Sequence, residues 1–412
     1  MLIKPASLGG TLAPVASKSH LIRLLLASML AGEEVVIDNY TPSMDVDATL
    51  SCLEQLGLSH EVQGRTLRLR PRDRVERPRL SVGESGTLLR LILPILAALG
   101  VTAEVDARPS LRARPVQTAL ELLTKHGVAL NRGYPIAMTG KLQAGTYYVD
   151  VSMSSQFLSG FLMALPLLDE DSRIRLVGRP VSVGYVQMTL DVMSLFGIKV
   201  TPTMDGFVVW GHQTYRAPQR IRCEGDWSSA AFWVTAGALY SPVRLKGLDI
   251  GSTHNDKNIV EIVSQAGAKT RWDEGDLVVE PGDLVAIDRD LRYTPDLAPV
   301  VAVLCALSRG ESHLSGVRNL KVKECDRLSA ILSNLTAAGI ETYYSEETDC
   351  LTIVGGDPAP SRLLGFNDHR MAMSAAILLA KKGGELTDPD AVAKSYPGFW
   401  KDYVALGGSI CD

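Results

Sequence analysis

The sequence predicts an α/β fold, of the α+β kind, with two similar domains that each hold three α/β units around buried helices. Three observations predict this pseudo-sixfold repeat. A helical pattern that closes on glycine recurs about every seventy residues. A second, more apolar helical pattern keeps the same period, and strand-like runs lie between the two. The 412 residues divided by six give units of about 69, and internal repeats of this kind decide the architecture.

The amphipathic helices are recognised by the glycine that follows each of them. The closing glycines are separated by 70, 70, 70, 72 and 68 residues, and they are Gly57, Gly127, Gly197, Gly267, Gly339 and Gly407. Glycine is the expected left-handed residue just past a helix C-terminus. Each of these glycines therefore marks the end of one helix.

The second set of helices is apolar on all sides, which predicts that they are buried. They begin near Ser17, Ser85, Ser154, Asp226, Pro295 and Asp368. Their bodies are Leu21–Ala31, Thr87–Ala98, Phe157–Leu167, Ala230–Leu239, Ala298–Ala306 and Met371–Ala380. Because two kinds of element share one period, the repeat is not a coincidence of composition.

Strands are predicted where short runs rich in β-branched and apolar residues fall between these helices. The runs are Glu34–Asn39, Arg65–Arg70, Val101–Asp106, Thr146–Val151, Ile174–Val177, Phe207–Trp210, Val243–Lys246, Asp276–Glu280, Ser312–Ser315 and Leu351–Val354. The alternative architecture is a solenoid of six repeats that serves as an interaction protein. Repeats of this length and mixture favour two globular domains instead.

Composition and charge exclude several classes of function. Forty-two basic and 46 acidic residues give a net charge of -4, so no overall field favours nucleic acid or an anionic membrane. The N-terminal residues Met1–Pro5 do not begin a signal peptide, and the longest apolar runs are shorter than the ~18 residues of a membrane span. The six cysteines form no CxxC pair, which argues against zinc. A cytoplasmic protein with free thiols is expected.

Basic residues at the starts of the buried helices are the strongest functional signal. Ser, Asp and Asn at these starts are explained by helix capping. Cations are not, because the helix dipole disfavours them there, yet Lys18, Arg23, Arg90 and Arg370 lie within two turns of a helix start. Free backbone N–H groups beside Lys and Arg side chains bind phosphate or carboxylate. The pattern therefore predicts local anion binding in a chain that is acidic overall.

Further motifs add to this signal at the amphipathic helices: Arg112–Pro115, Ser182, Lys321–Arg327 and Lys394–Ser395. No P-loop and no GxGxxG turn is present, so neither of these routes to a nucleotide applies. No HExxH motif or acidic cluster has metal-ligand spacing.

Taken in order, these motifs resemble those of the 5-enolpyruvylshikimate-3-phosphate (EPSP) synthase family along the whole chain. The resemblance implies the enolpyruvyl transferase fold, in which each domain holds three βαβαββ units with buried parallel helices. The N-terminal domain would comprise residues 17–224, on the shikimate 3-phosphate side. Residues 1–16 and 225–412 would form the C-terminal domain on the phosphoenolpyruvate side, with the active site in the interdomain cleft. It also implies transfer of the enolpyruvyl group of phosphoenolpyruvate to the 5-hydroxyl of shikimate 3-phosphate, on the way to chorismate and the aromatic amino acids. No metal or organic cofactor is expected, and the chain is expected to be a monomer.

The resemblance also implies the residues that bind each substrate. Those expected at shikimate 3-phosphate are Lys18, Ser19, Arg23, Ser154, Ser155, Gln156, Ser182, Tyr185, Asp296, Asn319 and Lys323. Those expected at phosphoenolpyruvate are Lys18, Gly86, Thr87, Arg90, Arg114, Gln156, Glu324, Arg327, Arg370 and Lys394. Those at residues 17–23, 86–90, 112–115, 154–156 and 322–327 stand in the SKSxxxR, GTxxR, RARP, SSQ and VKExDR patterns of this sequence.

The chemistry of the reaction fits these residue types. The 5-hydroxyl must lose a proton as it attacks C2, and C3 must gain a proton and later return it. Acid/base groups and cations that stabilise the leaving phosphate are therefore needed. Asp296 is the candidate at the 5-hydroxyl, Glu324 the candidate at C3, and Lys18 a further group for proton transfer.

The sequence departs from the common family pattern in two places. Glu84 stands where many relatives have Asn, and Leu91 stands where many have Pro. A carboxylate at residue 84 would either repel phosphoenolpyruvate or pair with a neighbour. Gly86 leaves room for glyphosate, so sensitivity to this inhibitor is expected. His369 has two possible roles, a structural one and one in proton transfer, and the structural role is favoured.

Two other enzyme families share related α/β units. The UDP-N-acetylglucosamine enolpyruvyl transferases are the nearest alternative, but their loop Cys or Asp before the RP motif has no counterpart here, since no cysteine lies between 52 and 223. An RNA 3′-phosphate cyclase would need ATP and a nucleophilic histidine. The SSQ and VKExDR motifs favour the shikimate substrate.

Overall fold

The computed structural model describes residues 1–152, 154–178 and 183–411, and the chain in it forms two compact units. One unit comprises Met1–Ser17 and Glu224–Asp412, and the other comprises Lys18–Cys223. The expected boundaries differ from these by one residue at each crossing. Two compact bodies are not the elongated stack of a solenoid.

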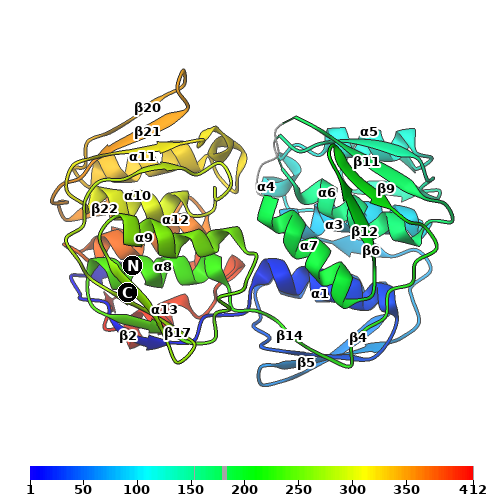
Figure 1. The fold of residues 1–412 in the computed structure, drawn as a ribbon, viewed down its shortest axis with the longest axis horizontal. Helices are drawn as coiled ribbons and strands as arrows, with labels where there is room; N and C mark the ends of the chain where they lie inside the picture. The colour runs from blue at the N-terminus through cyan, green and yellow to red at the C-terminus, as the bar shows by residue number, and fades with distance from the viewer. Residues whose placement is uncertain (153, 179–182, 412) are drawn as a thin grey trace. The chain divides into compact units, whose positions relative to one another are not determined.

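Six four-stranded sheets share one topology. Figure 1 shows helices and strands in both units. In each sheet an edge strand pairs in parallel with its neighbour, and the remaining two pairings are antiparallel. The sheet of β18 (Asp288–Asp290), β19 (Glu311–Ser315), β21 (Cys350–Val354) and β20 (Thr342–Ser345) is an example. A parallel pair requires a long crossover connection, and α10 (Ala298–Ala306) supplies it between β18 and β19.

The other five sheets repeat this order. In the unit of residues 18–223 they are β14 (Arg220–Arg222), β3 (Val35–Asp38), β5 (Thr66–Pro71) and β4 (Leu58–Gln63); β6 (Arg79–Ser81), β7 (Ala103–Asp106), β9 (Ile136–Thr139) and β8 (Ala129–Leu130); and β10 (Thr146–Asp150), β11 (Ser172–Val177), β13 (Gly206–Val209) and β12 (Val200–Thr203). In the other unit they are β2 (Gly10–Leu12), β15 (Val243–Leu245), β17 (Asp276–Glu280) and β16 (Lys269–Asp273); and β22 (Ser361–Leu363), β23 (Gly384–Leu386), β1 (Leu2–Lys4) and β24 (Ser409–Cys411).

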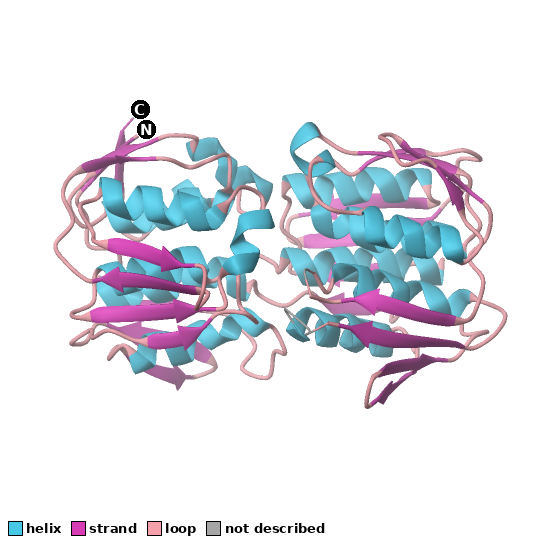
Figure 2. Cartoon of the chain, turned by 90° about the horizontal axis from the view of Figure 1, so that it is seen from above, coloured by secondary structure: helices cyan, strands magenta, loops and turns pink. Residues whose placement is uncertain are grey.

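Two strands belong to one unit while the helix that follows them belongs to the other. Strand β2 pairs with β15, but the chain then enters the second unit at Lys18. Strand β14 pairs with β3, and the chain then returns at Glu224. The two connections are joined where Ser17 N–H donates to the carbonyl of Glu224 at 2.9 Å. Strand β1 pairs with β24, so both ends of the chain lie together, as Figure 2 shows.

Each core is built around three apolar helices. They are α1 (Lys18–Ala31), α3 (Gly86–Ala98) and α6 (Gln156–Ala164, continued by η1, Leu165–Leu167) in one unit, and α8 (Trp227–Leu239), α10 and α12 (His369–Leu379) in the other. In α3, α8, α10 and α12 nearly every side chain is buried. Gly160 of α6 permits close contact with α3, because a Cβ there would lie 2.6 Å from the carbonyl oxygen of Arg90.

The amphipathic helices cover these cores and end as predicted. They are α2 (Met44–Gln55), α5 (Gln117–Lys125, preceded by α4, Pro109–Arg112), α7 (Val183–Leu195), α9 (Ile259–Gln265, preceded by η2, Asn255–Asn258), α11 (Arg327–Ala337, preceded by η3, Arg318–Val322) and α13 (Phe399–Ala405, preceded by η4, Pro389–Lys394). The six closing glycines have φ angles of 104, 94, 79, 111, 77 and 94°. Their left-handed conformation confirms the predicted helix ends.

The predicted fold class is confirmed. Every predicted strand corresponds to an observed one, while most strands that the sequence did not predict are short, with three or four residues. Among the residues that the structure describes, no helix combines the length and the apolar character that crossing a membrane requires.

Candidate functional site

The starts of the buried helices are shaped by side-chain caps. Ser85 Oγ accepts from the N–H of Leu88 at 3.3 Å, and Asp226 accepts from the N–H of Ser229 at 3.2 Å. Asp368 accepts from the N–H of Arg370 at 2.8 Å. These caps accept hydrogen bonds from some of the free backbone N–H groups in the first turn of each helix. The cations beside them are the residues whose surroundings decide the chemistry.

In the unit of residues 18–223, five expected residues meet at the start of α3. Gln156, the first residue of α6, accepts from Arg90 Nη1 at 3.0 Å and donates to Thr87 Oγ1 at 2.8 Å. A Cβ on Gly86 would lie 2.7 Å from Arg90 Nη1 and 2.9 Å from Arg114 Nη1. Two guanidinium groups therefore flank a residue without a side chain, which concentrates positive charge at a helix start.

A second group of expected residues lies on α1 and α7. Arg23 is 1% exposed, and its Nη1 donates to the carbonyl of Ser19 at 2.8 Å. The guanidinium carbon lies 5.8 Å from the centre of the Tyr185 ring. Lys18 Nζ donates to Asp45 Oδ2 at 2.8 Å. Asp45 lies in the first turn of α2, so a carboxylate from a neighbouring helix offsets the unfavourable position of Lys18 at a helix start.

The SSQ triplet leads directly into α6. Ser154 Oγ accepts from the N–H of Gln156 at 3.2 Å, and Ser155 is the buried residue that precedes the helix. Ser182, another expected contact, lies outside the described residues. Glu84 accepts from Ser110 Oγ at 2.8 Å, so a hydroxyl group is one partner of this carboxylate.

In the other unit, Arg327 joins three carboxylates. Its Nη1 lies 2.8 Å from Asp296 Oδ1, its Nη2 lies 2.7 Å from Glu324 Oε2, and its Nε lies 2.8 Å from Asp368 Oδ2. The side chains of Arg327 and Asp368 have no exposed surface. A buried cation requires such partners, since an uncompensated charge in the interior is strongly destabilising.

Two more cations reach Asp296, which precedes α10. Arg370 Nη2 lies 3.2 Å from Asp296 Oδ2, and Lys323 Nζ lies 3.5 Å from Asp296 Oδ1. Burial opposes the charge of Asp296, but Arg370, Lys323 and Arg327 together hold its pKa well below the usual range. The carboxylate therefore stays ionised at neutral pH.

Arg327 has the opposite shift. Burial opposes its charge, but Asp368, Glu324 and Asp296 raise its pKa well above the usual value. Burial also raises the pKa of the neighbouring Cys325 thiol to about 12. A thiol with so high a pKa is a poor nucleophile at neutral pH.

The remaining expected residues of this unit are Lys394 and Asn319, and His369 lies between them in the sequence. Lys394, at the end of η4, donates to the carbonyl of Asn367 at 2.6 Å, and Asn367 lies in the turn before α12. Asn319 is half-buried in η3, with no side-chain hydrogen bond among the described residues. His369 is buried, and its Nδ1 lies 4.0 Å from Asp368 Oδ1.

A further buried acid belongs to the electrostatic surroundings of Asp296. Asp256 in η2 is 1% exposed, and its Oδ2 accepts a hydrogen bond from Ser228 Oγ. Burial raises the pKa of Asp256, and the charge of Asp296 raises it further, whereas His254 and Arg370 lower it. Two buried carboxyl groups in one unit thus differ in the direction of their pKa shifts, a separation that is typical of acid/base sites.

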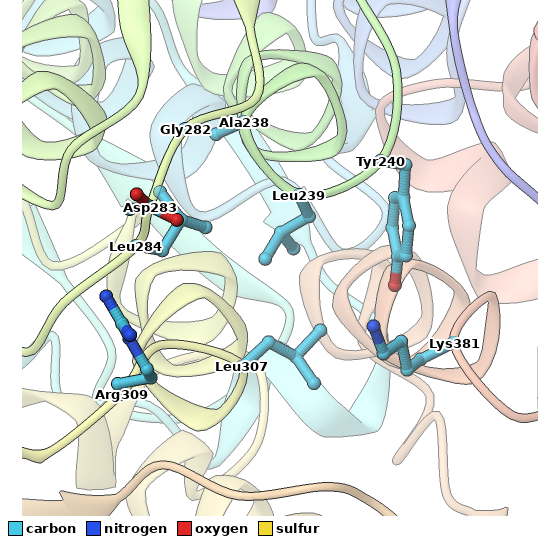
Figure 3. A pocket seen from close by; sticks show the side chains of 9 residues that line it. All are labelled: Ala238, Leu239, Tyr240, Gly282, Asp283, Leu284, Leu307, Arg309 and Lys381. Atoms are coloured by element: carbon cyan, nitrogen blue, oxygen red, sulfur yellow. The ribbon is translucent and has the colours of Figure 1, made fainter.

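A surface hollow of about 290 Å³ lies elsewhere in this unit (Figure 3). Leu239, Leu307 and Lys381 place it at the C-terminal ends of α8, α10 and α12. The view shows Arg309 and Lys381 on opposite sides of the leucine side chains. None of the expected residues lines it, because they gather at the opposite ends of the same helices.

Sequence comparison identifies the family. The family model for EPSP synthase (3-phosphoshikimate 1-carboxyvinyltransferase) matches residues 2–403. A 3-phosphoshikimate 1-carboxyvinyltransferase of Clostridium perfringens is 34% identical, with 100% of this chain and 99% of the relative covered. One from Methanopyrus kandleri is 35% identical, with 97% and 96% covered.

The chain belongs to the EPSP synthase family. An EPSP synthase structure from Acinetobacter baumannii has a TM-score of 0.81 at 23% identity, with 99% of both chains covered. The enolpyruvyl transferase NikO from Streptomyces tendae has a TM-score of 0.79 at 17% identity, with 99% of this chain and 97% of NikO covered. Both likenesses support the predicted enolpyruvyl transferase fold. The predicted family and fold are thereby confirmed, and the alternative of a UDP-N-acetylglucosamine enolpyruvyl transferase is not supported.

For this EPSP synthase family member, sequence reasoning missed several residues that hold the expected ones in place. Asp45 binds Lys18, Asp368 binds Arg327, and Thr189 accepts from Arg23 Nε at 2.7 Å. Asp368 stands at a predicted helix start, where capping accounts for it, and no signal in the sequence marked Asp45. Ser159 and Thr189 carried a weak signal, since each is a polar residue inside an apolar helical run.

Proposed function

We propose that the residues gathered at these helix starts carry out the reaction of the EPSP synthase family in this chain. The reaction transfers the enolpyruvyl group of phosphoenolpyruvate to the 5-hydroxyl of shikimate 3-phosphate and releases phosphate. The transferase activity follows from the family model across residues 2–403 and from the relatives that match over their whole length. The assignment of individual residues is the proposal.

The observation that carries the proposal is the joining of Asp296 and Glu324 by Arg327 at 2.8 and 2.7 Å. Addition and elimination at one carbon pair require acid/base groups next to cations. Asp296 takes the proton of the 5-hydroxyl as the hydroxyl oxygen attacks C2, and this proton leaves with the departing phosphate. Because three cations hold its pKa low, Asp296 becomes a stronger base only when bound anions draw those cations away.

Glu324 protonates C3 as C2 is attacked and later removes a proton from C3 as phosphate leaves. Arg327 fixes its orientation, and Cys325 beside it takes no chemical part. Lys18, held by Asp45, contributes a positive charge and a transferable proton. His369 is buried at the start of α12 and serves the structure there.

The cations of both units bind the substrate anions in the proposal. Ser19 and Arg23 bind the shikimate carboxylate, while Ser154, Ser155, Ser182 and Lys323 bind the 3-phosphate. The proposed contacts of phosphoenolpyruvate are Gly86, Thr87, Arg90, Arg114, Arg370 and Lys394. Asn319, Tyr185 and Gln156 complete the contacts. The proposal requires both sets of residues to act on the same pair of substrates, in a cytoplasmic monomer without a metal or organic cofactor.

A phosphate-release assay tests the function directly. The purified chain is incubated with phosphoenolpyruvate alone, with added shikimate 3-phosphate, and with added UDP-N-acetylglucosamine. Phosphate release that depends on shikimate 3-phosphate is expected. Release that depends on UDP-N-acetylglucosamine instead would contradict the proposal, and so would release without an acceptor.

A further inference from the structure

Two buried hydroxyl groups contact the guanidinium group of Arg23, and the family reaction does not by itself explain them. Arg23 is a fully charged side chain with 1% exposure, and it lies between α1, α6 and α7. Thr189 Oγ1 on α7 accepts from its Nε at 2.7 Å. Ser159 Oγ on α6 lies 3.5 Å from its Nη2. Both hydroxyl groups are buried, with 0% exposure.

The hydroxyl groups are themselves held by the protein. Thr189 Oγ1 lies 2.8 Å from the carbonyl oxygen of Tyr185 and 2.9 Å from Ser159 Oγ. A hydroxyl group has one proton and two acceptor positions. When Thr189 donates to the carbonyl of Tyr185, its lone pairs face Arg23 Nε. The backbone of α7 thus fixes the direction in which Thr189 accepts.

These contacts fix the plane of the guanidinium group. Nε is held by Thr189 and Nη1 by the carbonyl of Ser19, so two nitrogens are restrained in different directions. The ring of Tyr185 lies over one face at 5.8 Å. Carboxylate recognition by arginine depends on this plane, because the two ions meet through parallel hydrogen bonds.

We propose that Thr189 and Ser159 are positioning residues that orient Arg23 for the carboxylate of the acceptor substrate. The inference rests on the proposed function, which assigns that carboxylate to Arg23. Thr189 contributes most to this positioning, because its hydrogen bond with Arg23 is shorter than that of Ser159. Ser159 supports both Thr189 and Arg23.

The test compares variants of Thr189 in the full-length chain by steady-state kinetics with both substrates. Thr189→Val keeps the shape and removes the hydroxyl group, and we expect it to raise the KM for shikimate 3-phosphate about tenfold. The kcat and the KM for phosphoenolpyruvate stay near their wild-type values. Thr189→Ser restores the hydroxyl group and most of the affinity.

Thr235→Val is a matched control. Thr235 is a buried threonine of α8 whose Oγ1 has no hydrogen-bond partner among the described residues. Its substitution should change neither KM. If Thr189→Val does not fold, Ser159→Ala replaces it, with an expected increase of about threefold in the same KM because its contact is longer.

A double-mutant cycle separates positioning from a general structural effect. Arg23→Lys removes the fork-shaped group that Thr189 orients, so Thr189→Val should have little further effect in that background. An unchanged KM for shikimate 3-phosphate in Thr189→Val overturns the inference. Equal increases of both KM values, or full additivity with Arg23→Lys, overturn it as well.

The measurements distinguish a failure of the proposed function from a failure of the inference about Thr189 and Ser159. A wild-type chain that releases no phosphate with both substrates contradicts the function itself. An active wild type whose KM for shikimate 3-phosphate is unaffected by Arg23→Lys contradicts the assignment of Arg23. Only an active chain with a sensitive Arg23 and an insensitive Thr189 isolates the failure of the positioning residues.

Discussion

Arg327 is the residue whose surroundings depart most from its expected role. It was expected to contact phosphoenolpyruvate, yet three carboxylates surround a guanidinium group with no exposed surface. The side chain therefore orders the two acid/base candidates, Asp296 and Glu324, more directly than it meets a ligand. In the proposed mechanism, Lys323 and Lys394, which are more accessible cations of the same unit, bind substrate anions.

Replacing Glu324 by Gln tests its role at C3. The amide keeps the size of the side chain but does not transfer protons, so kcat should fall by at least about 10². Binding of shikimate 3-phosphate, measured by calorimetry, should be unchanged. Glu347→Gln is the control, because Glu347 is an exposed residue outside the cluster. Near-normal turnover of Glu324→Gln would remove this residue from the mechanism.

Gly86 controls the space beside two guanidinium groups. The added Cβ of Gly86→Ala would lie 2.7 and 2.9 Å from Arg90 Nη1 and Arg114 Nη1, so these side chains must move. We expect a higher KM for phosphoenolpyruvate and weaker inhibition by glyphosate, while the wild type is sensitive to it. Gly133→Ala is the control, since nothing lies within 4 Å of its Cβ position. A millimolar inhibition constant for the wild type would contradict the expected sensitivity.

At the scale of elements, two caps at helix starts differ in what else they hold. Asp368 caps α12 and also binds buried Arg327, whereas Asp326 caps α11 from an exposed position. Asparagine caps a helix about as well as aspartate. Asp368→Asn should therefore lower the free energy of unfolding by about 3–5 kcal/mol, because it weakens a buried ion pair. Asp326→Asn should leave it nearly unchanged. Equal effects in urea denaturation would show that the cap alone matters.

The element η2 holds an acid that makes stability depend on pH. Burial raises the pKa of Asp256 in the folded state, so its contribution is full below the usual pKa of about 3.9 and is lost as pH rises through the raised value. Asp256→Asn avoids that loss. The difference in Tm between variant and wild type should therefore grow in favour of the variant from pH 4 to pH 7.

The acids with lowered pKa values do not obscure this measurement. Asp296 and Asp368 contribute stability above the usual pKa, and this is lost only as pH falls through their lowered values. Their effect on stability therefore falls mostly below pH 4, outside the range of the Tm measurement. Asp283→Asn, an exposed position, serves as the control. A difference in Tm that does not change with pH would refute the prediction.

The elements also show which parts of the structure the sequence could predict. The closing glycines were predictable, because a left-handed φ is a local property tied to one residue type. Strands such as β1 and β14 were not, since three residues carry little periodic signal and their partners lie far along the chain. The same holds for the ion pair of Arg327 with Asp368, which are 41 residues apart. The sequence showed that charged residues stand at helix starts, but it did not show which residue each of them would pair with.

At the scale of the molecule, the division into units predicts that one of them is autonomous. Lys18–Cys223 is a continuous segment that contains all strands of its three sheets, including β14 beside β3. The isolated segment should unfold in one cooperative thermal transition and bind shikimate 3-phosphate more weakly than the whole chain. A version that ends at Pro218 lacks β14, leaves the edge of β3 unpaired and should be less stable. An unfolded Lys18–Cys223 segment would contradict the prediction.

The pairing of β1 with β24 has a consequence for the order of events during synthesis. Leu2 lies opposite Cys411, so β1 waits for β24 until the residues between them have been made. At ~5–20 residues per second, this wait is about 20–80 s. The segment of residues 18–223 completes its sheets roughly halfway through that time. The chain thus carries one body whose sheets are complete while β1 and β2 still lack their strand partners, and the sheet of β1 is complete only once β24 has been made.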